Sequence, residues 1–202
     1  ATALAVALLV LPGAGGAEPQ KPLSSCRGSE RYIPQGTFPV EYPGSDAARR
    51  KWYSLALERM REPALSCRGW PGAEAYRILW LSDRYPPVGI RITRYAQSYE
   101  LVATQLSGLG YNDPGVILNQ IHKTLTAADW SRLQAALEKN GFWAMPTSGN
   151  FYGLHGEQWI IEGGRNTAYH ITDRWTPPAG AYRELGRLFF ELAGWLAPAA
   201  GP

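Results

Sequence analysis

The residues that could do chemistry concentrate in two segments near the C-terminus, 157–164 and 168–175, which read EQWIIEGG and AYHITDRW. Both segments are predicted to be β-strands. Only Arg165, Asn166 and Thr167 separate them, so an antiparallel hairpin with a three-residue turn is expected. The length of this turn decides which side chains lie opposite one another.

A three-residue turn places four polar side chains together on one face of the hairpin. Glu162 then lies opposite His170, and Gln158 lies opposite Arg174. The carboxylate would raise the pKa of the imidazole, and the guanidinium would bind ligand oxygens. This face is therefore predicted to bind a polar or anionic ligand. The other face is predicted to pack against a C-terminal helix, through Trp159, Ile161, Ile171 and Trp175.

The hairpin also allows other interpretations. Glu162 and His170 could form an ion pair that only fixes the register, contributing under ~1 kcal/mol when exposed. With a two-residue turn, by contrast, Glu162 and His170 would not lie on the same face of the hairpin. An enzymatic use of Glu162, His170 and Arg174, as in a small-molecule hydrolase, would need a cleft that the sequence does not reveal.

No other motif indicates a catalytic or metal site. The sequence lacks the motifs GxSxG, SxxK, HExxH, GxGxxG and GxxxxGK[ST], which mark common nucleophile, zinc and nucleotide sites. His122, His155 and His170 do not share a metal-ligand spacing on one element. The sequence therefore predicts no catalytic residue, no bound metal and no cofactor.

A glycine-punctuated loop over 142–154 is rich in aromatic residues. Because aromatic side chains often anchor protein interfaces, Trp143, Phe151 and Tyr152 are predicted to contact a partner. The alternative is a loop that folds these rings back onto the core.

The surrounding pattern predicts the elements that must position these residues. A helix is expected over 46–62, and Thr126 with Asp129 marks the start of a second. Between them, period-two segments predict a four-strand meander at 75–83, 88–96, 99–107 and 116–124. With the hairpin and a last amphipathic helix, the order is α-β-β-β-β-α-β-β-α. This order predicts an α+β fold, an antiparallel sheet covered by helices on one face.

The N-terminal part of the chain resembles an export signal. Residues 1–11 are apolar, uncharged and too short to span a bilayer, and small residues follow up to Ala17. We therefore predict a signal peptide over 1–17, a Pro-rich extended segment over 18–45, one domain over 46–196 and a flexible tail over 197–202. The protein is expected to be periplasmic or secreted, with no membrane span after cleavage.

The two cysteines, Cys26 and Cys67, fit an exported protein. An even number outside the cytoplasm predicts a disulfide, which would stabilise a loop of this size by roughly 4 kcal/mol. Leu23-Ser24-Ser25-Cys26 also resembles a lipoprotein signal, although it does not directly follow the apolar stretch. Lipidation of Cys26 is therefore the alternative.

Composition excludes several classes of protein. The 202 residues include 20 basic and 17 acidic side chains, and the net charge of +3 is too small and scattered to indicate nucleic-acid binding. Eight Trp, 11 Tyr and 5 Phe supply apolar area that a disordered chain lacks.

Several residue pairs in the second half of the chain form a pattern: Gln158-Trp159, Glu162-Gly163, Tyr169-His170, Arg174-Trp175 and Leu185-Gly186. The pattern resembles that of a group of uncharacterised exported proteins of Gram-negative bacteria. This chain departs from the group at His155, where a small acidic residue is expected, and at Thr167, where Gly is expected. The resemblance implies export and the expected fold, and it implies no reaction.

These observations together favour a non-enzymatic periplasmic binding or inhibitory protein. Its partner would be a protein or a small polar ligand. The hydrolase that uses Glu162, His170 and Arg174 and the envelope lipoprotein anchored at Cys26 are the alternatives.

Overall fold

The computed structural model describes residues 32–41, 43–67, 74–96, 98–111, 113–149, 155–166 and 168–199. The elements of this part are α1 (Ser45–Arg59), β1 (Glu74–Ser82), β2 (Val88–Arg94), β3 (Tyr99–Leu106), β4 (Ile117–Leu125), α2 (Ala127–Lys139), η2 (Phe142–Ala144), β5 (Glu157–Arg165), β6 (Ala168–Trp175) and α3 (Ala181–Ala193). The order agrees with the predicted one, and every strand begins and ends within two residues of its expected bounds.

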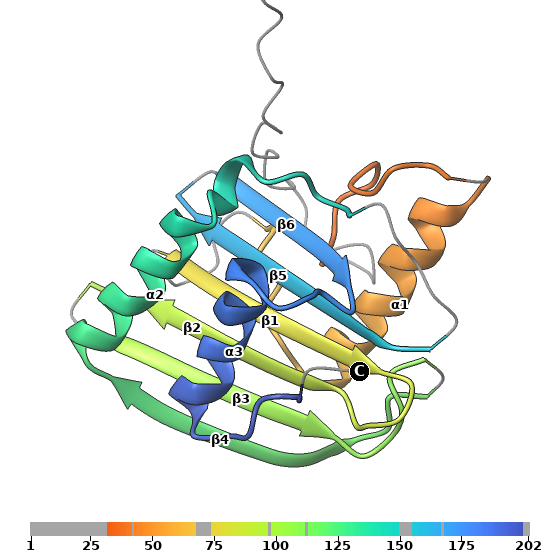
Figure 1. Cartoon of the computed structure of the whole chain (residues 1–202). Coiled ribbons are helices and arrows are strands. Elements are labelled where there is room, and N and C mark those ends of the chain that lie inside the picture. The colour runs from red at the N-terminus through yellow and green to blue at the C-terminus, as the bar shows by residue number, and fades with distance from the viewer. Residues whose placement is uncertain are drawn as a thin grey trace, which may run out of the picture.

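The six strands form one antiparallel sheet in the order β4-β3-β2-β1-β5-β6. β1 to β4 pair in sequence and make the predicted meander. The hairpin of β5 and β6 joins this meander where β5 pairs with β1 (Figure 1). The α+β fold class is therefore confirmed.

Helices cover both faces of the sheet, and the expected one-sided cover is wrong. α2 and α3 pack on the face that carries Tyr76, Ile78 and Trp80. α1 packs behind the sheet, on the face that carries Leu79 and Leu81 (Figure 1). β1 is buried at every position, because each of its faces meets a helix. A strand covered on both sides loses the polar face from which a single helical layer was inferred.

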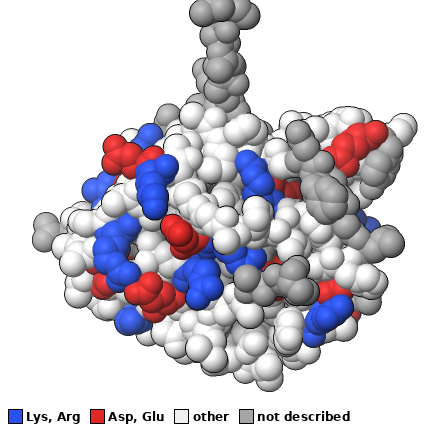
Figure 2. Space-filling model, viewed as in Figure 1, with Lys and Arg blue, Asp and Glu red and all other residues white. Residues whose placement is uncertain are grey.

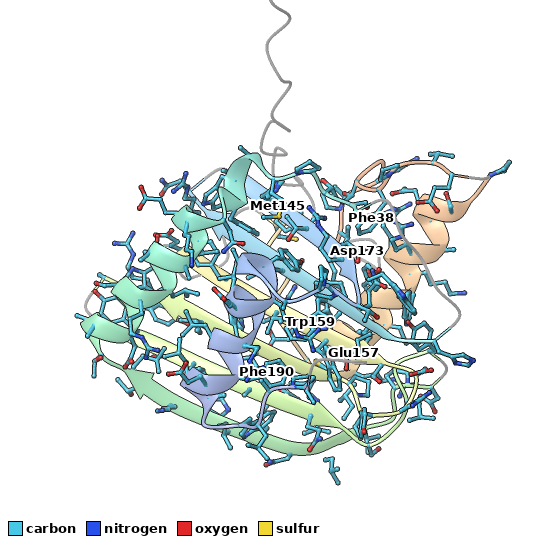
Figure 3. The ribbon with its side chains drawn as sticks, viewed as in Figure 1. Phe38, Met145, Glu157, Trp159, Asp173 and Phe190 are labelled. Carbon is cyan, nitrogen blue, oxygen red and sulfur yellow. The ribbon has the colours of Figure 1, made fainter. Side chains whose placement is uncertain are left out.

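Trp159 is at the centre of the core between the sheet and α3. Its ring is fully buried, and its centroid is 6.3 Å from that of Phe190 (Figure 3). Ile161 belongs to the same core, as predicted. Ile171 instead packs on the α1 side, and Trp175 lies on the same face of β6 as Ile171, so the expected contacts of these two with the last helix are wrong.

α2 begins and ends as its sequence indicates. The Thr126 hydroxyl accepts a hydrogen bond from the Asp129 amide, and the Asp129 carboxylate accepts one from the Thr126 amide, which makes a capping box. Gly141, with φ 59°, follows the helix in the left-handed conformation that suits glycine.

Positive and negative side chains alternate over the face that α2 and α3 form (Figure 2). Arg132 pairs with Glu191 and Lys139 pairs with Glu184, so ion pairs join the two helices at the surface. Such mixing agrees with the absence of a polybasic pattern in the sequence. Among the described helices, none combines the length and the apolar character that crossing a bilayer requires.

Candidate functional site

The register of the C-terminal hairpin differs from the predicted one by one residue. Arg165 pairs with Ala168, so the connection is Asn166 and Thr167 rather than three residues. Gly163 therefore lies opposite His170, and Glu162 lies opposite Ile171. Since neighbouring side chains on a strand point to opposite faces, Glu162 and His170 lie on different sides of the sheet. The predicted pairing of Glu162 with His170 is wrong.

Glu162 belongs to a buried ion network on the α1 side of the sheet. Its carboxylate accepts hydrogen bonds from Arg77 Nε at 2.7 Å and from the Tyr169 hydroxyl at 2.8 Å. Arg77 is fully buried and also pairs with Glu62, which in turn accepts from Arg91. These carboxylates already have partners inside the protein, so the network is structural.

His170 lies on the opposite face, beneath the chain that follows η2. Its Nε2 donates to the carbonyl oxygen of Met145 at 2.9 Å, and its ring contacts those of Phe142 and Trp143. Burial lowers the pKa of this imidazole from its ordinary value, and the charge of Arg174 acts in the same direction. The raised pKa expected from a neighbouring carboxylate is therefore wrong.

Gln158 and Arg174 are also on different faces. The Gln158 amide donates to the buried carboxylate of Asp173, which also accepts from the Tyr53 hydroxyl. Arg174 donates to the carbonyl oxygens of Pro146 and Thr147 and borders a small hollow of about 400 Å³. The four predicted ligand-binding residues therefore do not form one site.

The predicted partner contacts have divided outcomes. Trp143 is half-buried, donates to the Tyr76 hydroxyl and is stacked by the Arg165 guanidinium at 4.4 Å. The alternative of a ring folded back onto the core therefore holds for Trp143. Phe151 and Tyr152 lie outside the described residues, as does Cys26. The disulfide between Cys26 and the buried Cys67 stays a prediction.

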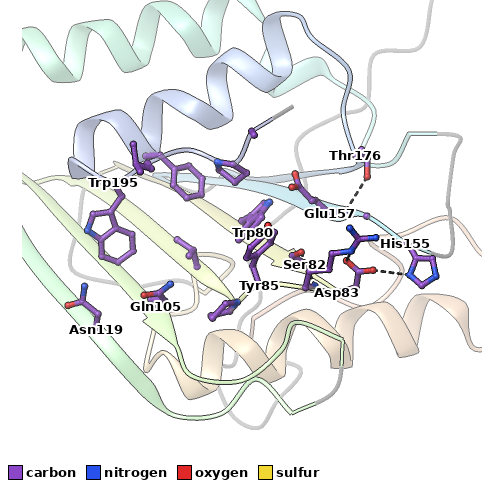
Figure 4. Close-up of a pocket in the computed structure, with 18 of the residues that line it drawn as sticks. Trp80, Ser82, Asp83, Tyr85, Gln105, Asn119, His155, Glu157, Thr176 and Trp195 are labelled. Atoms are coloured by element: carbon purple, nitrogen blue, oxygen red, sulfur yellow. Dashed lines mark hydrogen bonds and ion pairs between the residues drawn. The ribbon is translucent and has the colours of Figure 1, made fainter. Parts of the chain in front are cut away.

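The sheet forms a different site at the other end of its α3 face, an open cavity of about 880 Å³ (Figure 4). Its floor is a row of residues that pair directly across four strands, namely Trp80, Val88, Gln105 and Asn119. One wall is the turn between β1 and β2, where Tyr85 stacks against Trp80 with the ring centroids 6.1 Å apart. The cavity therefore has aromatic rings near its middle and amide side chains on its β3–β4 side.

The roof of the cavity is the segment that follows α3. Trp195, Leu196 and Pro198 line it, together with Phe190 from the last turn of the helix. Arg183 holds this segment in place, because its guanidinium donates to the carbonyl oxygens of Pro177 and Ala199. The shape of the cavity thus depends on a buried arginine that joins both flanks of α3.

Ionisable groups lie at the end of the cavity where β1 stops. His155 Nδ1 donates to the Asp83 carboxylate at 2.9 Å, and Arg84 lies 4.0 Å from the same carboxylate (Figure 4). Glu157 accepts from the indole of Trp159, which stands on the same strand. Within the described part of the chain, no group of three or more His, Cys, Asp or Glu could hold a metal ion.

Two features of the lining carry an energetic cost. The Trp80 indole N–H is buried, and no hydrogen-bond acceptor for it exists among the described residues. Thr176 has φ 35°, a conformation that β-branched residues rarely adopt, and its hydroxyl accepts from the Glu157 amide. Both residues line this cavity, and backbone strain of this kind is often found at ligand-binding sites.

Comparison with known proteins adds no assignment: neither a scan against family models nor a search of curated proteins gives a match for this chain. The site rests on its own geometry.

The sequence did not reveal this cavity, although it carried partial signals. Gln105 and Asn119 are amide residues within the predicted strands, and Tyr85 is an aromatic residue in a turn. Each signal is common alone. Only the sheet order places them beside the segment that follows α3, which is far away in the sequence.

Proposed function

We propose that this protein is an exported, non-enzymatic binding protein, and that the cavity beneath the segment following α3 holds its small-molecule ligand. The observation that carries the proposal is the cavity itself. Its volume of about 880 Å³ is in the range of small-molecule sites, and four aromatic residues line it: Trp80, Tyr85, Phe190 and Trp195. The unpaired indole of Trp80 and the strained Thr176 support the same location.

Export is supported by the apolar stretch over 1–11 and the small residues after it. The hydrolase alternative loses its geometric support, because Glu162 and His170 lie on different faces. The lipoprotein alternative requires an acyl group on Cys26, and mass spectrometry of the mature N-terminal peptide tests for that group.

Indole NMR of the protein with ¹⁵N-labelled tryptophan tests the binding proposal. The probes are uncharged, anionic and cationic ring compounds: phenol, nicotinamide, adenosine, methyl glucoside, benzoate and benzamidine. At least one of them should shift the indole signals of Trp80 and Trp195, assigned through Trp80→Phe and Trp195→Phe. The Trp143 indole is the internal control, because it is outside the cavity and donates a hydrogen bond to the Tyr76 hydroxyl. Its NMR signal should not shift.

The binding proposal is overturned if neither these compounds nor the saccharides named in the next subsection move the indole signals of Trp80 and Trp195. Equal shifts at Trp143 would also overturn it, because they would show unspecific association.

A further inference from the structure

The charged side chains around the cavity are paired with other groups of the protein, and this pairing affects which ligands, charged or uncharged, the cavity can bind. This step rests on the binding function proposed above. Asp83 has His155 and Arg84 beside it, at 2.9 Å and 4.0 Å. Glu157 accepts from Trp159 and lies 3.9 Å from Arg183. Since an anionic or cationic ligand would compete with these pairs, the lining favours an uncharged ligand.

Uncompensated hydrogen-bonding groups occur at both ends of the cavity. On the β3–β4 side, the amide side chains of Gln105 and Asn119 have no hydrogen-bond partner within the described ranges. At the other end, the hydroxyl groups of Ser82 and Thr176 accept from backbone amides and keep their own protons for a ligand. A suitable ligand therefore needs both donors and acceptors.

The separation of the two ends sets the length of the ligand. Asn119 and Trp80 lie in one row across the sheet, three strand spacings apart. At about 4.8 Å for each spacing, this distance is roughly 14 Å. Ser82 lies two residues further along β1, on the same face as Trp80. One six-membered ring cannot reach both ends, so the ligand contains more than one ring.

Aromatic rings fill the space between the two polar ends. Trp80 and Tyr85 stack on one another, and Trp195 lines the same space from above. The negative face of an aromatic ring attracts the positively polarised C–H groups of a saturated ring. A sugar ring offers such C–H groups on its faces and hydroxyl groups, which both donate and accept, around its edge.

We propose that the cavity binds an uncharged oligosaccharide, with one sugar ring at Gln105 and Asn119 and another beside Ser82 and Thr176. The rings between these ends lie against Trp80, Tyr85 and Trp195.

Titration calorimetry and indole NMR with maltotriose, cellotriose and tri-N-acetylchitotriose test this proposal. At least one trisaccharide should bind and shift the indoles of Trp80 and Trp195, and the matching monosaccharide should bind at least tenfold more weakly. Asn119→Ala should weaken the binding of the trisaccharide at least tenfold. The matched control is Gln120→Ala, at the next residue of β4. The Gln120 side chain is on the opposite face of the sheet, where it donates a hydrogen bond to the Thr104 hydroxyl. This substitution should leave the affinity for the trisaccharide unchanged.

The outcomes separate this inference from the proposed function. If ring compounds of the first panel shift Trp80 and Trp195 but no trisaccharide binds, the cavity is a binding site and the oligosaccharide proposal is wrong. If a trisaccharide binds with equal affinity to the wild type and to Asn119→Ala, the proposed position along the row is wrong. If neither panel moves these indoles, both proposals fail together.

Discussion

Single residues show how the protein pairs its buried charges. Arg77, Glu162, Glu62 and Arg91 form a chain of ion pairs on the α1 side of the sheet, with Arg77 fully buried between two carboxylates. Glu162 was predicted to bind a ligand because a three-residue turn would place it opposite His170. The structure gives this carboxylate another role, since the buried arginine on the neighbouring strand requires a carboxylate.

Glu162→Gln should therefore lower the free energy of unfolding by about 3 kcal/mol, because the substitution removes one of the two carboxylates that neutralise the buried Arg77. Glu184→Gln is the matched control: it breaks an exposed pair with Lys139 and should change stability by less than about 0.5 kcal/mol. Urea unfolding of both variants measures the difference. Equal effects of the two substitutions would show that the buried network adds nothing beyond a surface pair.

His170 makes the stability depend on pH. Its folded pKa is lowered, chiefly by burial, so the unfolded chain takes up the proton first as the pH falls. This contribution to stability is complete above the ordinary histidine pKa of about 6.5 and is lost as the pH falls through it towards the folded value. His170→Gln should therefore reduce the loss of stability between pH 8 and pH 5.5, as measured by urea unfolding at each pH.

NMR titration of His170 supplies the independent check. Glu162→Gln should leave the pKa of His170 unchanged, since the two side chains are on opposite faces of the sheet. A shift of the His170 pKa in this variant would show that Glu162 and His170 interact, as the three-residue turn predicted.

At the scale of elements, the turn between β5 and β6 decides the face of every side chain in the hairpin. Asn166 has φ 51°, in the left-handed region that tight two-residue turns use. The sequence Asn-Thr lacks the glycine that usually marks such a turn, which is why a three-residue turn was expected. A shift of one residue in the register exchanged the two faces of β6 relative to β5, although both strands were predicted at nearly their observed bounds.

Asn166→Ala should destabilise the protein by about 1 kcal/mol, because a Cβ without a local hydrogen-bonding group makes the left-handed conformation unfavourable. Asn166→Gly should preserve stability to within about 0.5 kcal/mol, since glycine adopts this conformation without strain. Thermal and urea unfolding of the two variants compare them directly. A greater loss with glycine than with alanine would contradict the two-residue turn.

Secondary structure was accessible from the sequence because it depends on local periodicity, as in the capping box of Thr126 and Asp129. The cavity was not accessible, because its lining depends on the sheet order and on the segment after α3. Trp80 and Trp195 are far apart in the chain, and no local pattern relates them. What the sequence lacked was information on long-range pairing.

At the scale of the whole molecule, the core extends further towards the N-terminus than the expected boundary at residue 46. Tyr32, Ile33 and Phe38 are buried with α1 in the core behind the sheet. The carbonyl oxygen of Tyr32 accepts a hydrogen bond from the Ser66 hydroxyl at 2.8 Å. Part of the Pro-rich segment therefore packs on α1 and is hydrogen-bonded to the chain that follows this helix.

This anchor brings the two cysteines within reach of one another. Cys67 follows Ser66 directly, and Cys26 precedes Tyr32 by six residues, which span at most about 20 Å when fully extended. Non-reducing peptide mapping of the purified protein should therefore recover one peptide that joins Cys26 to Cys67. Cys26→Ser with Cys67→Ser should lower the free energy of unfolding by about 2–5 kcal/mol, because the unfolded chain is then no longer constrained by the loop. Two free thiols, or an acyl group on Cys26, would contradict the bridge, and the acylated form would make the protein an envelope lipoprotein.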